Sequence, residues 1–307
     1  MTASRPIAGA IIRVPQKLHF GYVAAGVFDA ERRALPIAPL FTSTDSVFPV
    51  ARPPVAAPSA TISGTCLWGG VAFDAFGHWL TETFAYLARM QPLLAAHPEA
   101  EVLMIRRIGA APLAWGALHR SFADRIGLDL SRIRVVMQDT RVERLILPPD
   151  PFGRANHYTP DTIASLDAAG FAPAAGNGRS LFLSRRRLSA GNDRTPNIAE
   201  VEAEFAAQGY DILYPEQLTL DEQLKQIVGA RHIAGENGSA LHWALYSPHI
   251  RSVISLGWKL KLQAGICAAR GQTCLTGRRP LIGPLLGRRQ SVPLNVIRRA
   301  IAAAKDA

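Results

Sequence analysis

Cysteine is scarce in this chain of 307 residues, which contains three such residues: Cys66, Cys267 and Cys274. They are scattered along the sequence, and none belongs to a CxxC pair or has a histidine at metal-ligand spacing. A disulfide framework or a zinc site requires closer and more regular spacing. We therefore expect three free or buried thiols.

Long apolar runs are also missing. No stretch approaches the roughly 18–20 apolar residues that a membrane-spanning helix requires. The apolar run near the N-terminus is interrupted by Arg13 and is too short for the core of a signal peptide. The sequence therefore predicts a cytoplasmic protein, with peripheral contact to the inner membrane as a further hypothesis for its basic surface.

Motifs that identify several common catalytic classes are absent as well. The chain has no Asp-x-Asp pair to clamp a metal ion on a diphosphate, and no GxxxxGK[ST], HExxH or GxSxG segment. Their absence argues against P-loop kinase, zinc-peptidase and α/β-hydrolase functions. We expect neither a metal ion nor an organic cofactor.

Charge is unevenly divided, because 34 lysines and arginines stand against 24 aspartates and glutamates, for a net charge of +10. Such a surplus favours acidic partners. No basic run is interleaved with aromatic residues, as a nucleic-acid surface would require. Nucleic-acid binding is thus the weakest hypothesis. A phosphate-bearing ligand or an anionic membrane surface explains the short arginine clusters as well as DNA does: 185–187, 278–279 and 288–289.

Strands and helices are expected to alternate along the second half of the chain. Thr219 and Glu222 have the spacing of a capping box, which opens a helix that ends near Val228. Further segments follow from apolar periodicity and turn residues: strands at 180–185, 210–214, 232–235 and 251–257, and helices at 197–209 and after Ser239. Short connections between such elements predict a parallel, doubly wound sheet.

The first half shows the same alternation less clearly. A proline- and alanine-rich, irregular lead-in at 34–60 precedes a helix that begins near Phe76. The glycine-rich stretch 171–180 is the predicted linker between two domains. An amphipathic helix at 294–305 is expected to pack back on the first domain. The remaining elements expected here are strands at 102–105, 132–137 and 143–152, and a helix near 112–127.

The segment FGHWLTETF (residues 76–84) places polar residues within an apolar run. On a helical wheel, His78 and Glu82 share the face opposite the apolar side. One interpretation is an exposed i,i+4 pair worth a few tenths of a kcal/mol. The other is a carboxylate–imidazole pair that accepts a proton from a hydroxyl group. Gly77 favours the second interpretation. Glycine inside a helix costs about 1 kcal/mol, so it is easier to explain where another group approaches closely or where the helix begins.

Two further segments suit phosphate binding. GENGSALHW (residues 235–243) follows a strand and opens a helix, so its glycines and first helical N–H groups suit a diphosphate. Arg185 and Arg186 end a strand, on the side of a parallel sheet where ligands bind. Taken singly, each segment also fits a simpler explanation, a glycine-rich turn with a serine cap or a solvated basic loop. The expected fold favours binding, because it directs both strand ends to one crevice.

These segments follow one another in the order of a known enzyme family. FGHWLTE, the strand end SRRR, the helix start NIAE, GYDILYPEQLTLDEQ and GENGSAL resemble glycosyltransferase family 61, which includes bacterial transferases for capsular and surface polysaccharides. The resemblance covers roughly residues 70–257. It implies an α/β, GT-B-like fold of two Rossmann-like domains with parallel sheets and an interdomain cleft. We expect an acceptor-side domain at 1–175, a nucleotide-sugar domain at 176–290 and a C-terminal helical segment at 291–307.

The resemblance implies roles for individual residues. His78 and Glu82 match the acceptor-side motif and become the catalytic candidates, with Glu82 favoured as base and His78 orienting it. Asn237 and Trp243 depart from the family pattern, which bears on the identity of the donor and on activity. The donor-binding candidates comprise four matches to family positions, Arg185, Arg186, Gly238 and Ser239, together with Glu236 for hydroxyl groups, Asn237 in the turn and His242 for phosphate.

The implied function is inverting, metal-independent glycosyl transfer. A hexose or pentose would pass from a nucleotide sugar to a hydroxyl group of a glycan or lipid-linked saccharide in bacterial surface polysaccharide biosynthesis. The leaving diphosphate would be stabilised by the arginines and by the 238–239 turn. The alternative from another class is a non-catalytic nucleotide- or glycan-binding partner in a polysaccharide pathway.

Overall fold

The computed structural model describes residues 5–17, 23–35, 54, 56–106, 112–149, 158–188, 195–257, 261–276 and 291–306. Most of the proline-rich lead-in lies outside these residues, as do the arginine clusters at 278–279 and 288–289. The chain divides into two compact units, Met1–Gly153 and Arg154–Ala307. The domain assignment made from sequence, with its boundary between 175 and 176, remains a prediction.

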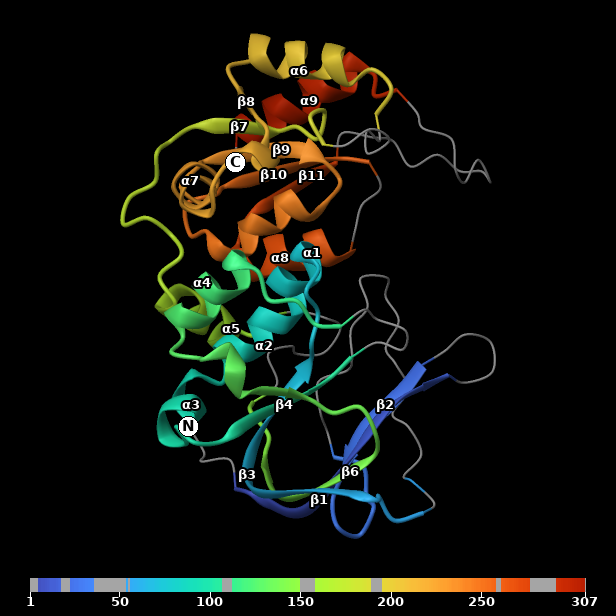
Figure 1. Cartoon of the computed structure of the whole chain (residues 1–307). Coiled ribbons are helices and arrows are strands. Elements are labelled where there is room, and N and C mark those ends of the chain that lie inside the picture. The colour runs from blue at the N-terminus through green and yellow to red at the C-terminus, as the bar shows by residue number, and fades with distance from the viewer. Residues whose placement is uncertain are drawn as a thin grey trace. The chain divides into compact units, whose positions relative to one another are not determined.

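The first unit is built on a six-stranded sheet in the order β2-β1-β6-β3-β4-β5 (Figure 1). β6, β3, β4 and β5 run parallel to one another, whereas β1 is antiparallel to both β2 and β6. The sheet is therefore mixed, where the sequence predicted a parallel one. Its strands are β1 (Ile7–Lys17), β2 (Val23–Phe28), β3 (Ala60–Val71), β4 (Glu101–Ile105), β5 (Ile133–Val135) and β6 (Thr140–Ile146).

The segment after β3 is helical, as the sequence predicts, and it is buried on nearly every side. α1 (Phe76–His78), a π-helical turn η2 (Trp79–Thr83) and α2 (Phe84–Ala88) follow one another directly. Between Trp79 and Met90, every residue except Glu82 and Arg89 is buried. The remaining helical elements of this unit are α3 (Gln91–Ala96), α4 (Ala117–Arg125) and η3 (Leu130–Arg132).

The second unit contains a five-stranded sheet in which every neighbouring pair is parallel, in the order β11-β10-β9-β7-β8. Read from the β8 edge and numbered within the unit, this order is 2-1-3-4-5, which is the flavodoxin-like order of doubly wound sheets. The predicted parallel sheet is therefore confirmed for this unit. The strands are β7 (Ser180–Leu183), β8 (Asp211–Leu213), β9 (His232–Glu236), β10 (Ser252–Leu256) and β11 (Thr273–Thr276).

The predicted capping box of the second unit is confirmed. The backbone N–H of Thr219 donates to Glu222 Oε2 at 2.8 Å, and the N–H of Glu222 donates to Thr219 Oγ1 at 3.3 Å. Among the helices that are described, none is long and apolar enough to cross a membrane. The helical elements here are α5 (Pro160–Ala168), α6 (Ile198–Ala207), η5 (Pro215–Gln217), α7 (Leu220–Gln223), the π-helical turn η6 (Leu224–Val228), the 3₁₀ helix η7 (Ser239–Tyr246), α8 (Lys261–Arg270) and α9 (Leu294–Lys305).

The core of the second unit lies between the sheet and a helix pair. α6 and α9 lie side by side on one face of the sheet, and α8 lies on the other face (Figure 1). Phe182 of β7 stacks on Phe205 of α6 with ring centroids 4.5 Å apart, and Ile301 of α9 joins the same cluster. Arg298 of α9 also donates to both carboxylate oxygens of Glu204 at 2.8–2.9 Å. The sequence placed this helix against the N-terminal domain, whereas its apolar side is buried within the second unit.

Phe205 provides a test of this core. Its side chain is fully buried, so we expect Phe205→Ala to lower the free energy of unfolding by about 3–5 kcal/mol through lost burial and a residual cavity. Urea unfolding followed by circular dichroism measures the change. The control is Met137→Ala, since Met137 is 77% exposed and should change the free energy by no more than about 0.5 kcal/mol. Equal stability of the two variants would contradict the assigned core.

Candidate active site

The carboxyl end of β3 is a switch point of the first sheet. β3 lies between β6 and β4 and is parallel to both. The chain leaves β3 through a helical connection to β4 on one side, while β6 pairs on the other side. Ligands of α/β sheets bind outside the carboxyl ends of strands at such points. The segment 72–84 therefore begins at the ligand-binding edge of this sheet.

Thr83 fixes the helix to this edge. Its hydroxyl group donates to the carbonyl oxygen of Val71 at 3.0 Å and accepts the N–H of Phe73 at 3.0 Å. Thr83 is 1% exposed, so these bonds replace water for a buried hydroxyl. The position of the helix relative to the strand end is thus set by a buried polar contact in addition to apolar packing.

His78 and Glu82 form a hydrogen-bonded pair on this helix. Nδ1 of His78 lies 2.6 Å from Oε1 of Glu82, and the side chains are 24% and 10% exposed, respectively. An ionised carboxylate only accepts, so with Glu82 ionised Nδ1 carries the proton and Nε2 is left as the basic nitrogen. The ring of Phe73 stacks on that of His78 with centroids 4.7 Å apart and fixes its plane. The pair is therefore partly covered and ordered, unlike an i,i+4 pair on a solvated face.

Helix α4 packs against the connection between β3 and α1. The N–H of Gly116 donates to Nδ1 of His119 at 2.9 Å, so Nε2 of His119 carries the proton and donates to the carbonyl oxygen of Asp74 at 3.0 Å. Burial lowers the pKa of His119, and its hydrogen bond to the Asp74 carbonyl partly opposes that effect. Trp79 packs its ring against His119 and Trp115, with centroids 4.7 and 5.2 Å apart. The imidazole of His119 is therefore a neutral structural clamp.

Asp74 and Arg106 lie at the same edge and were missed in the sequence. Arg106 follows β4 directly, and its Nη2 lies 3.4 Å from Oδ2 of Asp74. The Arg106 side chain is only 10% exposed. Arg106 was identifiable from position, since it follows the predicted strand at 102–105, whereas the strand that precedes Asp74 was not predicted. Neither belongs to a motif that distinguishes it from an ordinary surface ion pair.

The second sheet has its own switch point at the carboxyl end of β7, which lies between β8 and β9. The residues that leave β7 and β9 meet there. A methyl group added to Gly238 would lie 2.9 Å from Nη1 of Arg185, which is closer than carbon atoms normally come. The guanidinium group of Arg185 thus lies against the backbone of the 238–239 turn. The structure brings together these two predicted donor-binding residues.

The neighbouring backbone of this turn is closely packed. The N–H of Asn237 donates to the carbonyl oxygen of Leu256 at 3.1 Å, which extends the pairing of β9 with β10 by one bond. A methyl group on Gly257 would lie 3.2 Å from Cβ of Asn237. Asn237, Gly238 and Ser239 are each partly exposed. The turn is therefore held in place while its residues remain accessible.

Arg186 is held by a carboxylate. Its Nη1 donates to Oε2 of Glu202 at 3.1 Å, and the Ser184 hydroxyl donates to Oε1 of Glu202 at 2.6 Å. Ser184 Oγ in turn accepts the N–H of Arg186 at 3.1 Å. Glu202 is 7% exposed, whereas the Arg186 side chain is 51% exposed. Arg186 is thus oriented by Glu202 and still reaches the surface.

Glu202 is a third residue that the sequence interpretation missed, although a signal was present. In the helix that begins at Ile198, positions 198, 201 and 205 are apolar, and position 202 falls on the same side. A glutamate on the buried side of a helix requires a partner. The nearest basic cluster in the sequence is Arg185–Arg187 at the end of the preceding strand.

Glu236 and His242 are more deeply placed than the other candidates. Glu236 ends β9 and is 2% exposed. His242 lies within the 3₁₀ helix that begins at Ser239, is 6% exposed, and donates from Nδ1 to Oε1 of Gln263 on α8 at 3.1 Å. One ring nitrogen of His242 is therefore used within the protein.

Trp243, which departs from the family pattern described above, is a core residue. It is fully buried, and its Nε1 donates to Oε1 of Gln223 at 2.9 Å. The amide nitrogen of Gln223 donates to the carbonyl oxygens of Pro215 and Leu218 at 3.1 and 3.2 Å. The indole thus connects η7 to the turn that precedes α7.

Metal ligands do not gather in the described residues, where no group of three His, Cys, Asp or Glu side chains is placed to hold an ion. The absence of a metal from the reaction remains a prediction. None of the three cysteines, all of which lie in the described residues, forms a disulfide: Cys66, Cys267 and Cys274. Burial raises the pKa of Cys66 to about 11, so this thiol is not a nucleophile near neutral pH.

Comparison with known proteins identifies a family. The family model described as Glycosyltransferase 61 matches residues 76–254, which is more than half of the chain. The matched region begins at the first residue of α1 and extends to β10 of the second unit. A search of curated proteins finds no match.

The lowered pKa of His119 predicts a pH-dependent stability. Unfolded His119 takes up a proton near 6.5, whereas the folded side chain does so only at lower pH. Its contribution is complete above about pH 6.5 and is lost as the pH falls through the folded pKa. We expect the free energy of unfolding to fall more steeply between pH 7 and 5 in the wild type than in His119→Gln. Identical slopes would show that His119 does not titrate in this way.

Proposed function

Because the chain belongs to the glycosyltransferase 61 family, we propose that it transfers a sugar from a nucleotide-sugar donor to a hydroxyl group of a glycan or lipid-linked saccharide. The observation that carries this proposal is the extent of the family match. It includes the His78–Glu82 helix at the switch point of the first sheet, and the Arg185 and Gly238 contact at that of the second. Surface polysaccharide biosynthesis is the proposed pathway.

The proposal includes a GT-B-like organisation with an acceptor-side unit, a donor-side unit and a cleft between them. Two separate sheets with parallel strands support it. Each sheet carries candidate residues at the carboxyl end of a central strand, where ligands of such sheets bind. We assign the acceptor to the first unit and the nucleotide sugar to the second.

On the acceptor side, the His78–Glu82 pair would remove the proton of the attacking hydroxyl group. The oxygen then forms a bond to the anomeric carbon, the bond from that carbon to the diphosphate oxygen breaks, and the electron pair leaves with the diphosphate. Attack opposite the leaving group inverts the anomeric centre. The sequence favoured Glu82 as the base. The geometry instead favours Nε2 of His78, because His78 is the more exposed partner and its Nδ1 is engaged by Glu82.

On the donor side, negative charge develops on the leaving diphosphate. Arg185, Arg186 and the backbone N–H groups of the turn at Gly238 and Ser239 would stabilise that charge without a metal ion. Arg186 would do so while Glu202 orients it. Glu236 is assigned to hydroxyl groups of the ribose or sugar, because a carboxylate accepts their hydrogen bonds. His242 is assigned to phosphate.

One observation favours a second candidate function. Asn237 and Trp243 stand where the sequence departs from the pattern of the family that it resembles. A protein that binds nucleotide or glycan without transferring sugar would tolerate such changes. Thermal stabilisation by nucleotides, together with no nucleotide release from any donor, would favour this non-catalytic partner.

The catalytic pair is tested by nucleotide release from UDP-, GDP-, CMP- and dTDP-sugars. We expect His78→Ala and Glu82→Gln each to lower turnover by about 10²–10⁴-fold, since general base catalysis contributes that much. The control Glu99→Gln changes an exposed carboxylate of the same unit and should leave turnover unchanged. Undiminished turnover in both site variants would exclude the assignment.

Chemical rescue distinguishes the two possible bases. Added imidazole should restore part of the activity of His78→Ala if His78 accepts the proton, because a small base can occupy the vacated space. It should restore nothing to Glu82→Gln in that case. Rescue of neither variant, with a larger loss in Glu82→Gln, would return the role of base to Glu82.

The close approach of Arg185 to Gly238 predicts a coupled effect on donor binding. We expect Gly238→Ala to displace the guanidinium group and to raise the KM for the nucleotide sugar by roughly tenfold, since a hydrogen bond to a charged group contributes about 1.5–3 kcal/mol. In an Arg185→Ala background the same substitution should have little further effect. Additive effects in the double variant would show that Gly238 does not act through Arg185.

A further inference from the structure

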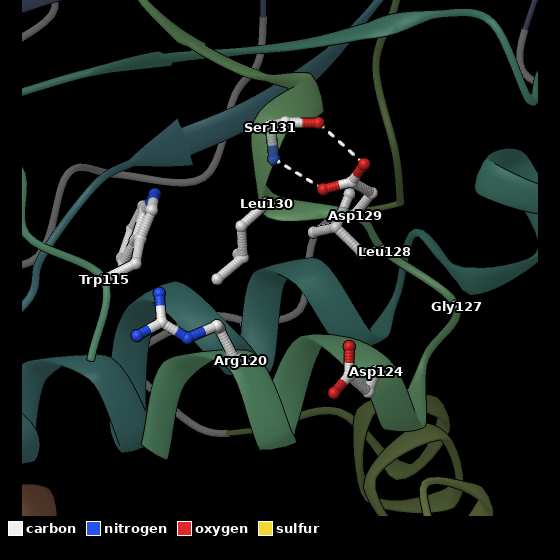
Figure 2. Close-up of a pocket in the computed structure, with 8 residues that line it drawn as sticks. All are labelled: Trp115, Arg120, Asp124, Gly127, Leu128, Asp129, Leu130 and Ser131. Atoms are coloured by element: carbon white, nitrogen blue, oxygen red, sulfur yellow. Dashed lines mark hydrogen bonds between the residues drawn. The ribbon is translucent and has the colours of Figure 1, made fainter. Parts of the chain in front are cut away.

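A pocket in the first unit lies outside the residues assigned so far. Its volume is about 550 Å³, within the range of small-ligand sites. Figure 2 shows Arg120 and Asp124 on α4, across from the turn that carries Leu128 and Leu130, with Trp115 at one end. The complete lining is Trp115, Arg120, Asp124, Gly127, Leu128, Asp129, Leu130 and Ser131.

The pocket combines an apolar surface with two available charged groups. Trp115, Leu128 and Leu130 supply the apolar part. In the described part of the chain, no hydrogen bond or ion pair engages the side chains of Arg120 or Asp124, which are both exposed. They are four residues apart and thus on one face of α4.

Asp129 is occupied, in contrast. It accepts the N–H and the hydroxyl group of Ser131 at 2.8 and 2.7 Å. Both bonds lower the pKa of Asp129, so the carboxylate stays charged. The lining therefore carries two negative groups, Asp124 and Asp129, against one positive group, Arg120. This balance disfavours phosphate and other anions.

These groups fit a sugar residue. Hydroxyl groups both donate and accept, so adjacent ones can donate to the Asp124 carboxylate and accept from the Arg120 guanidinium. The carbon-bound hydrogens of a sugar ring form an apolar face that suits the indole of Trp115. We propose that this pocket binds a neutral saccharide residue of the acceptor chain. The proposal rests on the function proposed above and extends it to an acceptor longer than a single sugar.

One wall of the pocket packs against the segment that carries His78 and Glu82. Trp115 contacts the rings of Trp79 and His119, with centroids 5.2 Å apart in both pairs. α4 carries His119, which donates to the Asp74 carbonyl, together with the adjacent Arg120 and, about one turn further on, Asp124. The wall of the pocket and the connection from β3 to α1 thus share one packed layer. When one saccharide residue of the acceptor binds in the pocket, the binding energy would position the reacting end of that acceptor.

The test measures binding of short neutral oligosaccharides without any nucleotide sugar, by tryptophan fluorescence and saturation-transfer NMR. A panel of neutral gluco-, xylo- and manno-oligosaccharides is compared with uronic-acid oligosaccharides and inorganic phosphate. We expect at least one neutral member to bind the wild type, and Asp124→Asn and Arg120→Gln to weaken that binding about tenfold or more, since a hydrogen bond to a charged group contributes about 1.5–3 kcal/mol. The control Asp221→Asn changes an exposed carboxylate of the second unit and should bind as the wild type does.

Three outcomes would overturn the pocket assignment: no neutral saccharide binds, only anions bind, or both pocket variants bind as the wild type does. Because these side chains make no contact that the fold needs, matching thermal midpoints should confirm that the variants are folded. Sugar transfer that continues with unchanged acceptor KM in both variants would reject the pocket and leave the proposed function intact. Saccharide binding that the variants lose, in a protein that turns over no donor, would retain the pocket and reject the proposed function.

Discussion

The parallel pairing of a central strand with neighbours on both sides is the constraint on which this structure depends. β3 and β7 each hold that position in their sheets. A parallel neighbour can be reached only by a crossover, so the chain must leave each strand at one edge and return at the other. The connections of several strands therefore meet at one edge, and polar residues gather there without being adjacent in sequence. This geometry explains why the candidate catalytic and donor-binding residues of each unit lie near the carboxyl ends of its strands.

Several polar groups at these edges are buried and have a specific partner. Thr83 is bonded to the backbone at the end of β3, His119 to the carbonyl of Asp74, and Glu202 to Ser184 and Arg186. A buried polar group without a partner is costly, so such contacts define the position of a side chain more narrowly than apolar packing does. Side chains held in this way lose little further freedom when a ligand binds.

The sequence predicted the second unit more fully than the first, for physical reasons. Strands such as β9 and β10 are short apolar runs between clear turns, and the capping box at Thr219 marks its helix locally. β1 and β2 were missed because a short apolar run does not reveal whether it forms a strand, and β1 pairs with β6, far away in the chain. The residue types of the candidate site were predictable from motifs. Their partners, such as Glu202 for Arg186, depend on which helix packs beside which strand.

The π-helical turn after His78 has a consequence for how this segment can vary. In η2 the N–H of Phe84 bonds to the carbonyl oxygen of Trp79, five residues earlier, so the turn holds one residue more than an α-helical turn. Each residue rotates the following side chains by about 100°. The extra residue thus sets the angle between the His78 ring and the Thr83 hydroxyl that is tied to β3. Deleting one residue from the segment would turn either the His78 ring or the Thr83 hydroxyl away from its present position. The length of this segment is therefore as constrained as its amino-acid composition.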